Sequence, residues 1–425
     1  MSAITLTQDQ QAAYDAVESF VQDPLQDRHI ISGYAGVGKT TLVDTIINNL
    51  ERMLAGQYND IASLVWEPVL TATTNKAAEA LQASTGRPVQ TVQKFLGLIV
   101  RKDWDNGGKS YLARGRRSTY QTNKIVFVDE ASYATQELMD YIDELCNGCK
   151  VIYIGDAAQL AAPKTVTTPV FSKGYPGSAL TEVVRQAKGN PIIELATGFR
   201  NIVRGEQSWF PIVIDGEHIQ HMSGAEYEQA LMAEFDRPDW HFKDSKVLAY
   251  TNARVIEYNR ALSNQIDGKL EIEVGDYVVN NNYVKLDRPS GEPSSISTDA
   301  IVHVTAMTPS SYYGVQGFDV TLDDYHLAFM PSQRTDVKEL LKLKKSEEDF
   351  ESMEIISNWV DLRATYACTV NKSQGSTFKK VFIDLTDIGK CRNYSTMARL
   401  LYVAVSRASH QLILTGDLVA QQQAA

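Results

Sequence analysis

The chain has 425 residues, of which 44% are hydrophobic and 22% are charged, and its 41 basic and 52 acidic side chains give a net charge of −11. At roughly 150 residues per domain, this length predicts two to three domains. The composition excludes long disorder, collagen-like repeats and coiled coil. The acidic balance argues against a protein that coats nucleic acid over its whole surface, but it leaves room for a local basic groove.

The N-terminus and the cysteines bear on cellular location. The first ten residues, MSAITLTQDQ, lack the basic start and the apolar stretch of a signal peptide, and no apolar run reaches the roughly 18 residues of a membrane span. Four cysteines suit a reducing compartment. We therefore expect a cytoplasmic protein, in the host cytoplasm if it is phage-encoded. Cys146 and Cys149 have no second pair at zinc-site spacing, so we interpret them as ordinary thiols.

Apolar runs alternate with helical patterns along the chain. Residues 9–21 place Ala13, Val17 and Phe20 at helical spacing, and HIISG follows as a strand. Further short apolar runs occupy residues 65–73, 124–130, 150–156, 246–252 and 380–385. Strands this apolar are buried on both faces, which is typical of parallel sheets covered by helices. The fold class predicted is therefore α/β.

Two stretches interrupt this pattern. Residues 98–114 contain two strand-like runs around DNGG, which is strong turn chemistry for a β-hairpin. The overlapping segment from Arg101 to Arg117 holds six basic and two acidic residues. From about Asp267 to Arg334 the chain has short alternating runs such as YVVNNNYVKL, which predict a small inserted antiparallel β-domain. Residues 335–362 then predict one charged amphipathic helix.

Residues 33–40 read GYAGVGKT, which matches the P-loop pattern between a strand and a helix. The glycines let backbone N–H groups curl round a β-phosphate, Lys39 reaches the β- and γ-phosphates, and the Thr40 hydroxyl takes a Mg²⁺ coordination position. The residues expected to bind the nucleotide here are Gly33, Ala35, Gly36, Val37, Gly38, Lys39, Thr40 and Thr41.

The segment KIVFVDEAS supplies two acidic groups directly after a buried strand. Asp129 is placed to hold Mg²⁺ together with Thr40, and Glu130 can act as general base for an attacking water. A nucleotide kinase needs no such base, so the pair favours hydrolysis. The next strand ends in IGDAAQLAAP, where Gln159 would face the γ-phosphate and report its loss.

The order of motifs resembles superfamily 1 helicases, specifically the RecD-like group that includes the bacteriophage Dda helicase, over almost the whole chain. The matching segments are LTQDQ, TATTNKAAEAL, LTEVVRQ, CTVNKSQGSTF and LLYVAVSRA. The resemblance implies two RecA-like P-loop domains. The first would span residues 1–185, with a hairpin pin at about 97–118. The second would span 186–425, with a small β-barrel and a helical brace at about 267–362.

The resemblance also assigns residues around ATP. Gln10 would read the adenine edge, and Gln374 and Gly375 would join the nucleotide site. Arg185 and Arg407 are the candidate arginines for the anionic phosphoryl-transfer transition state. If Arg407 comes from the second domain, ATP closes the cleft between the domains and hydrolysis opens it, which is the motor.

Single-stranded DNA would run across both domains, held by phosphate contacts and base stacking. The residues expected to contact DNA are Thr73, Thr74, Asn75, Lys76, Thr91, Phe95, Asn252, Lys372 and Ser373. Each could instead be a simple helix cap. Gln93 and Asn371 replace the histidines usual in the family's motifs Ib and V, and neither amide can carry a positive charge.

The hairpin falls where the family inserts its strand-separating pin. Trp104 or Tyr111 would be the wedge that meets the terminal base pair, and Arg101, Lys102, Lys109 and Arg114 would contact nearby phosphates. The alternative is that the aromatic side chains pack on their own strands.

We therefore expect a monomeric ATP-dependent DNA helicase that acts on single-stranded and forked duplex DNA without a membrane. The resemblance implies 5′ to 3′ movement and a phage accessory role in replication or recombination, with proteins of those processes as partners. One alternative is a translocase that displaces bound proteins and separates strands poorly. Another is an adaptor at DNA ends that uses ATP as a slow switch, although Glu130 argues against it because a switch needs no efficient base.

Overall fold

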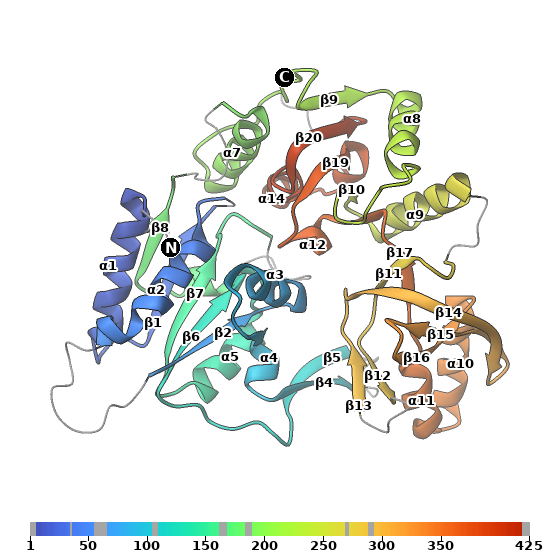
Figure 1. Ribbon diagram of the computed structural model, residues 1–425, viewed down its shortest axis with the longest axis horizontal. Helices are drawn as coiled ribbons and strands as arrows, with labels where there is room; N and C mark the ends of the chain where they lie inside the picture. Colours follow the sequence, from blue (N-terminus) through green and yellow to red (C-terminus); the bar gives the residue numbers. More distant parts are fainter. Residues whose placement is uncertain are drawn as a thin grey trace. The chain divides into compact units, whose positions relative to one another are not determined.

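The computed structural model describes residues 6–34, 36–54, 66–103, 109–160, 168–182, 189–267, 272–287 and 293–418. They group into two compact units, which are described separately (Figure 1). The first unit comprises Met1–Pro211 and Tyr394–Ser406, and the second comprises Ile212–Asn393 and Arg407–Ala425. This grouping places residues 186–211 with the first unit, whereas the sequence predicts a domain boundary after residue 185.

The first unit contains a six-stranded sheet in which every described pair is parallel. Its strands, in spatial order, are β3 (Val89–Thr91), β2 (Glu67–Ala72), β6 (Lys124–Asp129), β7 (Lys150–Gly155), β1 (Arg28–Gly33) and β8 (Gly177–Leu180). The interior residues of β6 alternate between two separate clusters, with Ile125 and Phe127 in one and Val126 and Val128 in the other. The prediction of parallel strands buried on both faces is confirmed.

Helices cover both faces of this sheet (Figure 1). The helices α1 (Gln8–Gln22) and α2 (Lys39–Leu54) pack on one face and α5 (Gln136–Leu145) on the other. The remaining helices of this unit are α3 (Asn75–Thr85), α4 (Val92–Phe95), the 3-10 turn η1 (Ala131–Tyr133), α6 (Pro169–Ser172), α7 (Pro191–Arg204) and α14 (Tyr394–Val405). Within the described residues, no helix combines the length and apolar character that crossing a membrane requires.

The expected hairpin is present as two antiparallel strands, β4 (Leu98–Asp103) and β5 (Lys109–Arg114). Their register pairs Leu98 with Arg114 and Asp103 with Lys109. The turn, residues 104–108, lies outside the described residues. The base of the hairpin is attached to α5, because the Leu112 N–H donates to Glu137 at 2.9 Å and the Tyr141 hydroxyl donates to the Leu112 carbonyl at 3.3 Å.

The second unit contains a five-stranded parallel sheet. Its strands, in spatial order, are β18 (Ala367–Thr369), β10 (Ser245–Ala249), β19 (Phe378–Asp384), β20 (Ala408–Thr415) and β9 (Ile219–Met222). The helices connected with this sheet are α8 (Gly224–Phe235), α9 (Asn252–Asp267), α12 (Val370–Ser373) and α13 (Leu385–Ile388). Residues of α8 and α9, including Tyr227, Leu231 and Leu262, share one core cluster with Val247 and Phe382 of the sheet.

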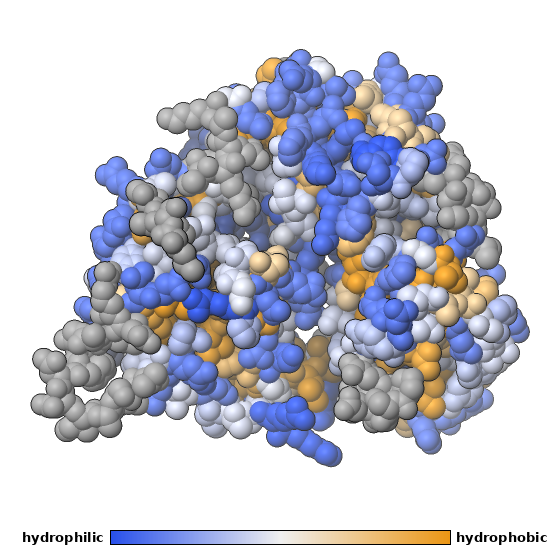
Figure 2. All heavy atoms as spheres, viewed as in Figure 1, coloured by the Kyte–Doolittle hydropathy of each residue, from blue (hydrophilic) through white to orange (hydrophobic). Residues whose placement is uncertain are grey.

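The segment predicted as an inserted β-domain forms an antiparallel sheet. Its strands, in spatial order, are β16 (His326–Pro331), β15 (Val315–Leu322), β14 (Ile301–Tyr312), β11 (Tyr277–Asn280) and β17 (Leu362–Ala364). A separate antiparallel pair joins β12 (Val284–Asp287) to β13 (Pro293–Ile296), so YVVNNNYVKL contributes to two sheets. Apolar side chains gather on the surface over β11 and β14, where Ile301 is exposed (Figure 2). Closure of these strands into a barrel stays a prediction.

The prediction of one helix over residues 335–362 is wrong. Two helices form instead, α10 (Arg334–Ser346) and α11 (Phe350–Ser357). The break has a local cause, because Glu348 adopts a φ of 55° and the Asp349 side chain caps α11 by accepting from the Ser352 N–H at 3.1 Å. Trp359 then packs with Phe329 and Ile356.

Candidate nucleotide site and nucleic-acid interface

The P-loop joins the end of β1 to the start of α2. Gly36 and Gly38 have φ values of 84° and 78°, a backbone region that residues with a side chain rarely adopt. Lys39 folds back over the loop, and its Nζ donates to the carbonyls of Gly33 and Tyr34 at 2.8 Å each. Thr40 and Thr41 continue into the first turn of α2, so the loop and the helix N-terminus offer the backbone donors that phosphates bind. Ala35 lies outside the described residues.

Gln10 lies against this loop. Its Nε2 donates to the Val37 carbonyl at 2.8 Å, and a Cβ added at Gly38 would come within 2.4 Å of that nitrogen. A capping box with Thr7 fixes the start of α1 and so orients Gln10. The sequence expectation that Gln10 belongs to the nucleotide site agrees with this position.

Asp9, beside Gln10, connects the start of α1 to the LTEV segment. Its carboxylate accepts from the backbone N–H groups of Thr181 at 2.5 Å and Glu182 at 2.8 Å. Although burial opposes the change, hydrogen bonds from Thr7, Glu182 and Thr181 lower the pKa of Asp9. Arg185, three residues further on, lies outside the described residues.

Asp129, Glu130 and Lys39 interact electrostatically at the carboxyl end of β6. Burial and the adjacent Glu130 charge raise the pKa of Asp129 to about 7, while the Lys39 ammonium acts in the opposite direction. Glu130 has a φ of 50°, which is a sparsely populated backbone conformation for a residue other than glycine. The hydroxyl of Thr40 and the carboxylate of Asp129 are hard oxygen donors, which fit Mg²⁺.

Thr73 has a different position from the one predicted. It is buried, its hydroxyl donates to the Glu130 carbonyl at 2.8 Å, and its N–H donates to the Asp129 carbonyl at 3.2 Å. The predicted DNA-phosphate contact from this side chain is corrected, because the hydroxyl is used inside the protein. Thr73 instead fixes the backbone that carries the two acidic residues.

Gln159 lies in the loop after β7, and its side chain is almost fully buried. Two residues of α14 hold this loop, and the sequence analysis missed both. Arg399 donates from Nη1 to the carbonyls of Ala157 at 2.6 Å and Gln159 at 2.8 Å, and the Tyr402 hydroxyl donates to the buried Asp156 carboxylate. Both belong to the segment that contains LLYVAVSRA, which was interpreted only through Arg407.

A second cluster missed by the sequence analysis involves Tyr34 of the P-loop. The Arg200 guanidinium lies 3.4 Å from the centre of the Tyr34 ring, and Arg204 donates to the Tyr34 hydroxyl at 2.9 Å. Both arginines belong to α7. The signal in the sequence was weak, because arginines at helical spacing are usually solvated.

In the second unit, Arg407 lies beside the loop that contains Gln374 and Gly375. Its side chain is buried, and Nη1 donates to the Ser376 carbonyl at 2.9 Å. Gly375 has a φ of 75°, so this loop also needs a glycine. The three predicted residues are therefore brought together within this unit.

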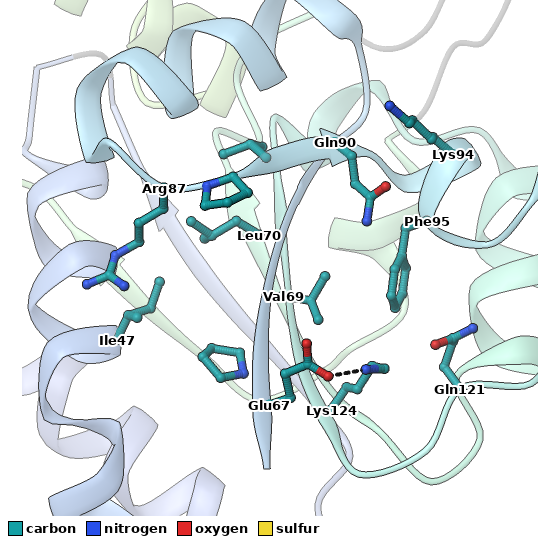
Figure 3. A pocket seen from close by; sticks show the side chains of 13 residues that line it. Ile47, Glu67, Val69, Leu70, Arg87, Gln90, Lys94, Phe95, Gln121 and Lys124 are labelled. Atoms are coloured by element: carbon teal, nitrogen blue, oxygen red, sulfur yellow. Dashed lines mark hydrogen bonds and ion pairs between the residues drawn. The ribbon is translucent and has the colours of Figure 1, made fainter. Parts of the chain in front are cut away.

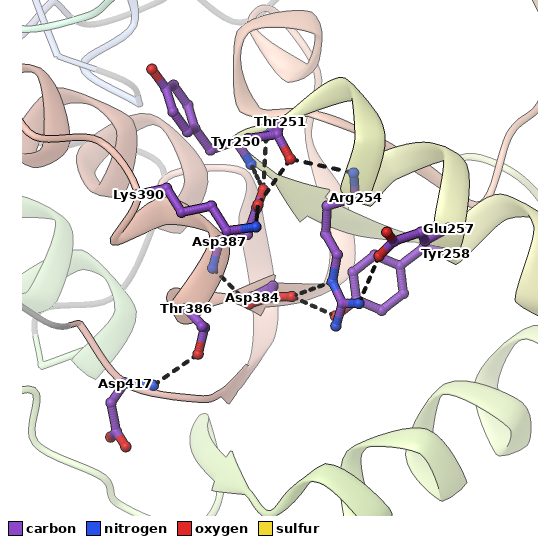
Figure 4. Close-up of polar contacts among 10 residues, drawn as sticks. All are labelled: Tyr250, Thr251, Arg254, Glu257, Tyr258, Asp384, Thr386, Asp387, Lys390 and Asp417. Carbon is purple, nitrogen blue, oxygen red and sulfur yellow. Dashed lines mark hydrogen bonds and ion pairs between the residues drawn. The ribbon is translucent and has the colours of Figure 1, made fainter.

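The start of α9, where Asn252 is the first residue, is capped by a carboxylate (Figure 4). Asp387 accepts from the backbone N–H groups of Tyr250 at 2.8 Å and Thr251 at 2.7 Å, and Lys390 pairs with its other oxygen at 2.8 Å. Although burial opposes the change, hydrogen bonds from Lys390, Thr251 and Tyr250 lower the pKa of Asp387. A DNA phosphate would have to contact the exposed Asn252 side chain rather than these donors.

The two DNA candidates of α12 differ from each other. Lys372 donates to Asn281 at 2.6 Å and pairs with Asp299 at 2.7 Å, which joins α12 to the inserted segment. Ser373 is fully buried, and its hydroxyl donates to the Val370 carbonyl at 2.7 Å. The predicted DNA contact from Ser373 is therefore corrected, because no phosphate reaches a buried hydroxyl.

In the first unit, Thr74 caps α3 and Thr91 caps α4, each by accepting one backbone N–H at 3.2 Å. Among the described residues neither hydroxyl donates to a protein acceptor, so both can donate to a phosphate. Asn75 and Lys76 lie in the first turn of α3.

Phe95 is half-buried and lines a pocket of about 580 Å³ (Figure 3). The pocket extends to Glu67 and Lys124 at the amino ends of β2 and β6. Asp129 lies at the opposite end of β6, so this pocket is not the nucleotide site.

On the hairpin, the Tyr111 side chain is 42% exposed and lies opposite Arg101. This exposure leaves the ring available to a base, and the alternative of packing on its own strand stays open. Arg114 forms an ion pair with Glu144 of α5. Trp104 lies outside the described residues, as do the side chains of Lys102 and Lys109.

Comparison with known proteins identifies the family. The AAA domain family matches residues 5–220, which is just over half of the chain. The chain belongs to the AAA domain family. A UvrD-like helicase C-terminal domain also matches residues 364–415. With both matches, the chain is a superfamily 1 helicase, an ATP-hydrolysing enzyme.

Two curated relatives are similar to this superfamily 1 helicase. A protein of Acanthamoeba polyphaga mimivirus is 22% identical, over 95% of this chain and 98% of the relative. The ATP-dependent RecD2 DNA helicase of Deinococcus radiodurans is 28% identical, over 49% of this chain and 26% of the relative.

Solved structures show the same fold. The Pif1 helicase from Candida albicans has a TM-score of 0.50 at 15% identity, over 97% of this chain and 95% of that chain. A Pif1 structure described for unwinding at forked duplex DNA has a TM-score of 0.50 at 16% identity, over 99% of this chain and 94% of that chain. The prediction of two RecA-like domains is confirmed at the level of fold.

Proposed function

We propose that this superfamily 1 helicase acts on DNA, moves 5′ to 3′ along a single strand and separates the duplex ahead of it. The observation that carries the ATP-driven part of the proposal is the grouping of Gln10, Lys39, Asp129 and Glu130 around one P-loop. The similarity to the RecD2 DNA helicase supports DNA as the substrate. The 5′ to 3′ direction rests on the RecD-like order of motifs, in the group that includes the Dda helicase.

The proposed chemistry is ATP hydrolysis with an in-line water. Lys39 holds the β- and γ-phosphates, and Thr40 with Asp129 would hold Mg²⁺, which neutralises phosphate charge when bound. Glu130 accepts the proton of the attacking water. Arg185 and Arg407 stabilise the charge of the transition state, which is a contribution on the order of 10³–10⁵ in rate for an arginine finger.

The proposed DNA contacts combine phosphate binding with one aromatic wedge. Thr74, Thr91 and Asn252 donate from helix starts to phosphates, which binds DNA without reading its sequence. Tyr111, exposed on the hairpin, meets the terminal base pair. Opening each step costs about 1.4 kcal/mol of stacking. We further propose a monomer that supports phage replication or recombination together with proteins of those processes.

The test is ATP-driven strand separation on two matched duplexes, one with a 5′ tail and one with a 3′ tail, with ATP turnover recorded in the same tubes. We expect separation of the 5′-tailed duplex only. Separation from the 3′ tail alone would retain the helicase and reject the RecD-like direction, while turnover without separation would favour the translocase. Glu130→Gln is the matched variant, and turnover that equals wild type would reject Glu130 as the base.

A further inference from the structure

The contact between α14 and the loop after β7 has no role in the function proposed so far. The loop carries Gln159, the candidate that faces the γ-phosphate, and it begins at Asp156 directly after β7. Arg399 and Tyr402 reach this loop from a helix that is more than 230 residues away in sequence. Such a long-range polar contact costs conformational entropy to form, so its geometry is informative.

The contact involves polar groups of residues 156–159, in the described part of the loop. Asp156 accepts from the Tyr402 hydroxyl on one oxygen and from the Ala158 N–H at 2.9 Å on the other. A single nitrogen of Arg399, Nη1, donates to the carbonyls of both Ala157 and Gln159. Asp156 and Tyr402 are each 3% exposed, and buried hydrogen bonds of this kind are costly to break one at a time.

The Asp156 carboxylate also interacts electrostatically with the Arg399 guanidinium. Burial lowers the pKa of Arg399, and the Asp156 carboxylate opposes that change. Removing either charge would leave the other uncompensated in a poorly solvated place. These bonds therefore hold residues 156–159 of the loop against α14.

We propose that Arg399 and Tyr402 are positioning residues that make the position of the Gln159 loop depend on α14. The same helix is followed in sequence by Ser406 and Arg407, so α14 connects the residue that would sense the γ-phosphate with the candidate arginine finger. The consequence is that nucleotide state and affinity for single-stranded DNA are linked through these two side chains. The inference rests on the proposed function.

The test measures that linkage directly. Dissociation constants for a fluorescent oligo-dT are measured with ADP and with a non-hydrolysable ATP analogue, and their ratio is the coupling. We expect Arg399→Met and Tyr402→Phe each to reduce the factor by which the two dissociation constants differ by at least about fivefold, since coupling factors are typically 5–150-fold. Nucleotide affinity without DNA should stay within about threefold, because neither side chain is among the residues of the P-loop site.

Controls separate positioning from folding. Arg392→Met and Tyr394→Phe remove the same groups from exposed positions near the start of α14, and both should keep the wild-type ratio. Arg399→Lys, which can still donate to both carbonyls, should recover part of the ratio. A purely structural role would lower the melting temperature and leave the ratio unchanged.

The outcomes are distinct. Unchanged ratios in both variants would overturn the inference, and so would a loss of nucleotide affinity that accounts for the whole change. A wild-type protein that binds no single-stranded DNA, or that binds it equally with both nucleotides, would instead reject the proposed function, and the inference would fall with it.

Discussion

Replacing Gly38 with alanine is expected to damage the P-loop in two separable ways. Gly38 has a φ of 78°, and a Cβ there would lie 2.4 Å from the Gln10 Nε2 atom. That nitrogen donates to the Val37 carbonyl at 2.8 Å. Alanine therefore strains the backbone and also displaces the Gln10 amide from a buried hydrogen bond.

The two costs can be estimated from the geometry. A non-glycine residue in the left-handed region costs about 1–2 kcal/mol, and loss of one hydrogen bond costs about 0.5–1.5 kcal/mol. Gly38→Ala should thus lower the free energy of unfolding by about 1.5–3.5 kcal/mol. Gly86 is the matched control, because its φ is 66° and an added Cβ meets nothing within 4 Å. Gly86→Ala should lower the free energy of unfolding only by the cost of the backbone strain, about 1–2 kcal/mol.

The assay is urea unfolding of the full chain, with nucleotide binding measured in parallel. In a Gln10→Ala background the displaced amide is absent, so the cost of Gly38→Ala should fall to that of Gly86→Ala. Gly38→Ala alone should also weaken nucleotide binding, because the displaced loop backbone is the part that binds phosphates, whereas Gly86→Ala should not. Equal costs for the two glycines in the wild-type background would refute the role assigned to Gln10.

Three further predictions follow from single contacts. The pKa of Asp129, raised to about 7 by burial and Glu130, lies above its unfolded value near 4, so its contribution to stability is present at low pH and is lost as pH rises to 7. Without Mg²⁺, the stability of Asp129→Asn relative to wild type should therefore increase by about 2–3 kcal/mol between pH 5 and 8 in urea unfolding, and a flat difference would contradict the shift. Ser373→Ala should leave oligo-dT affinity within about twofold, whereas Lys372→Met should reduce the salt slope of binding by about one if Lys372 exchanges its partners for a phosphate. Tyr111→Ala should lower the base pairs separated per ATP while DNA-stimulated turnover persists, and an unchanged ratio would reject Tyr111 as the wedge.

Several features could be predicted from sequence because their signals are local. The P-loop glycines at 36 and 38 need positive φ, which few other residues tolerate, so spacing alone located the loop. The runs KIVFVD and KVIYIG are apolar at consecutive positions, and only a strand buried on both faces uses such a run in full. The prediction of a single helix over 335–362 was wrong because the charge pattern continues across the break. The Asp349 cap begins a second helix, α11, within that pattern.

The fold class, the P-loop and the acidic pair could be predicted from the residues alone, because each depends on positions close together in the chain. Three other features become visible only in the folded chain: the Thr73 and Ser373 hydroxyls are used inside the protein, Asp387 occupies the start of α9, and Arg399 holds the Gln159 loop. Whether a hydroxyl meets a phosphate or a buried carbonyl depends on what lies beside it in space. Those neighbours come from distant strands and helices, and no local spacing encodes them.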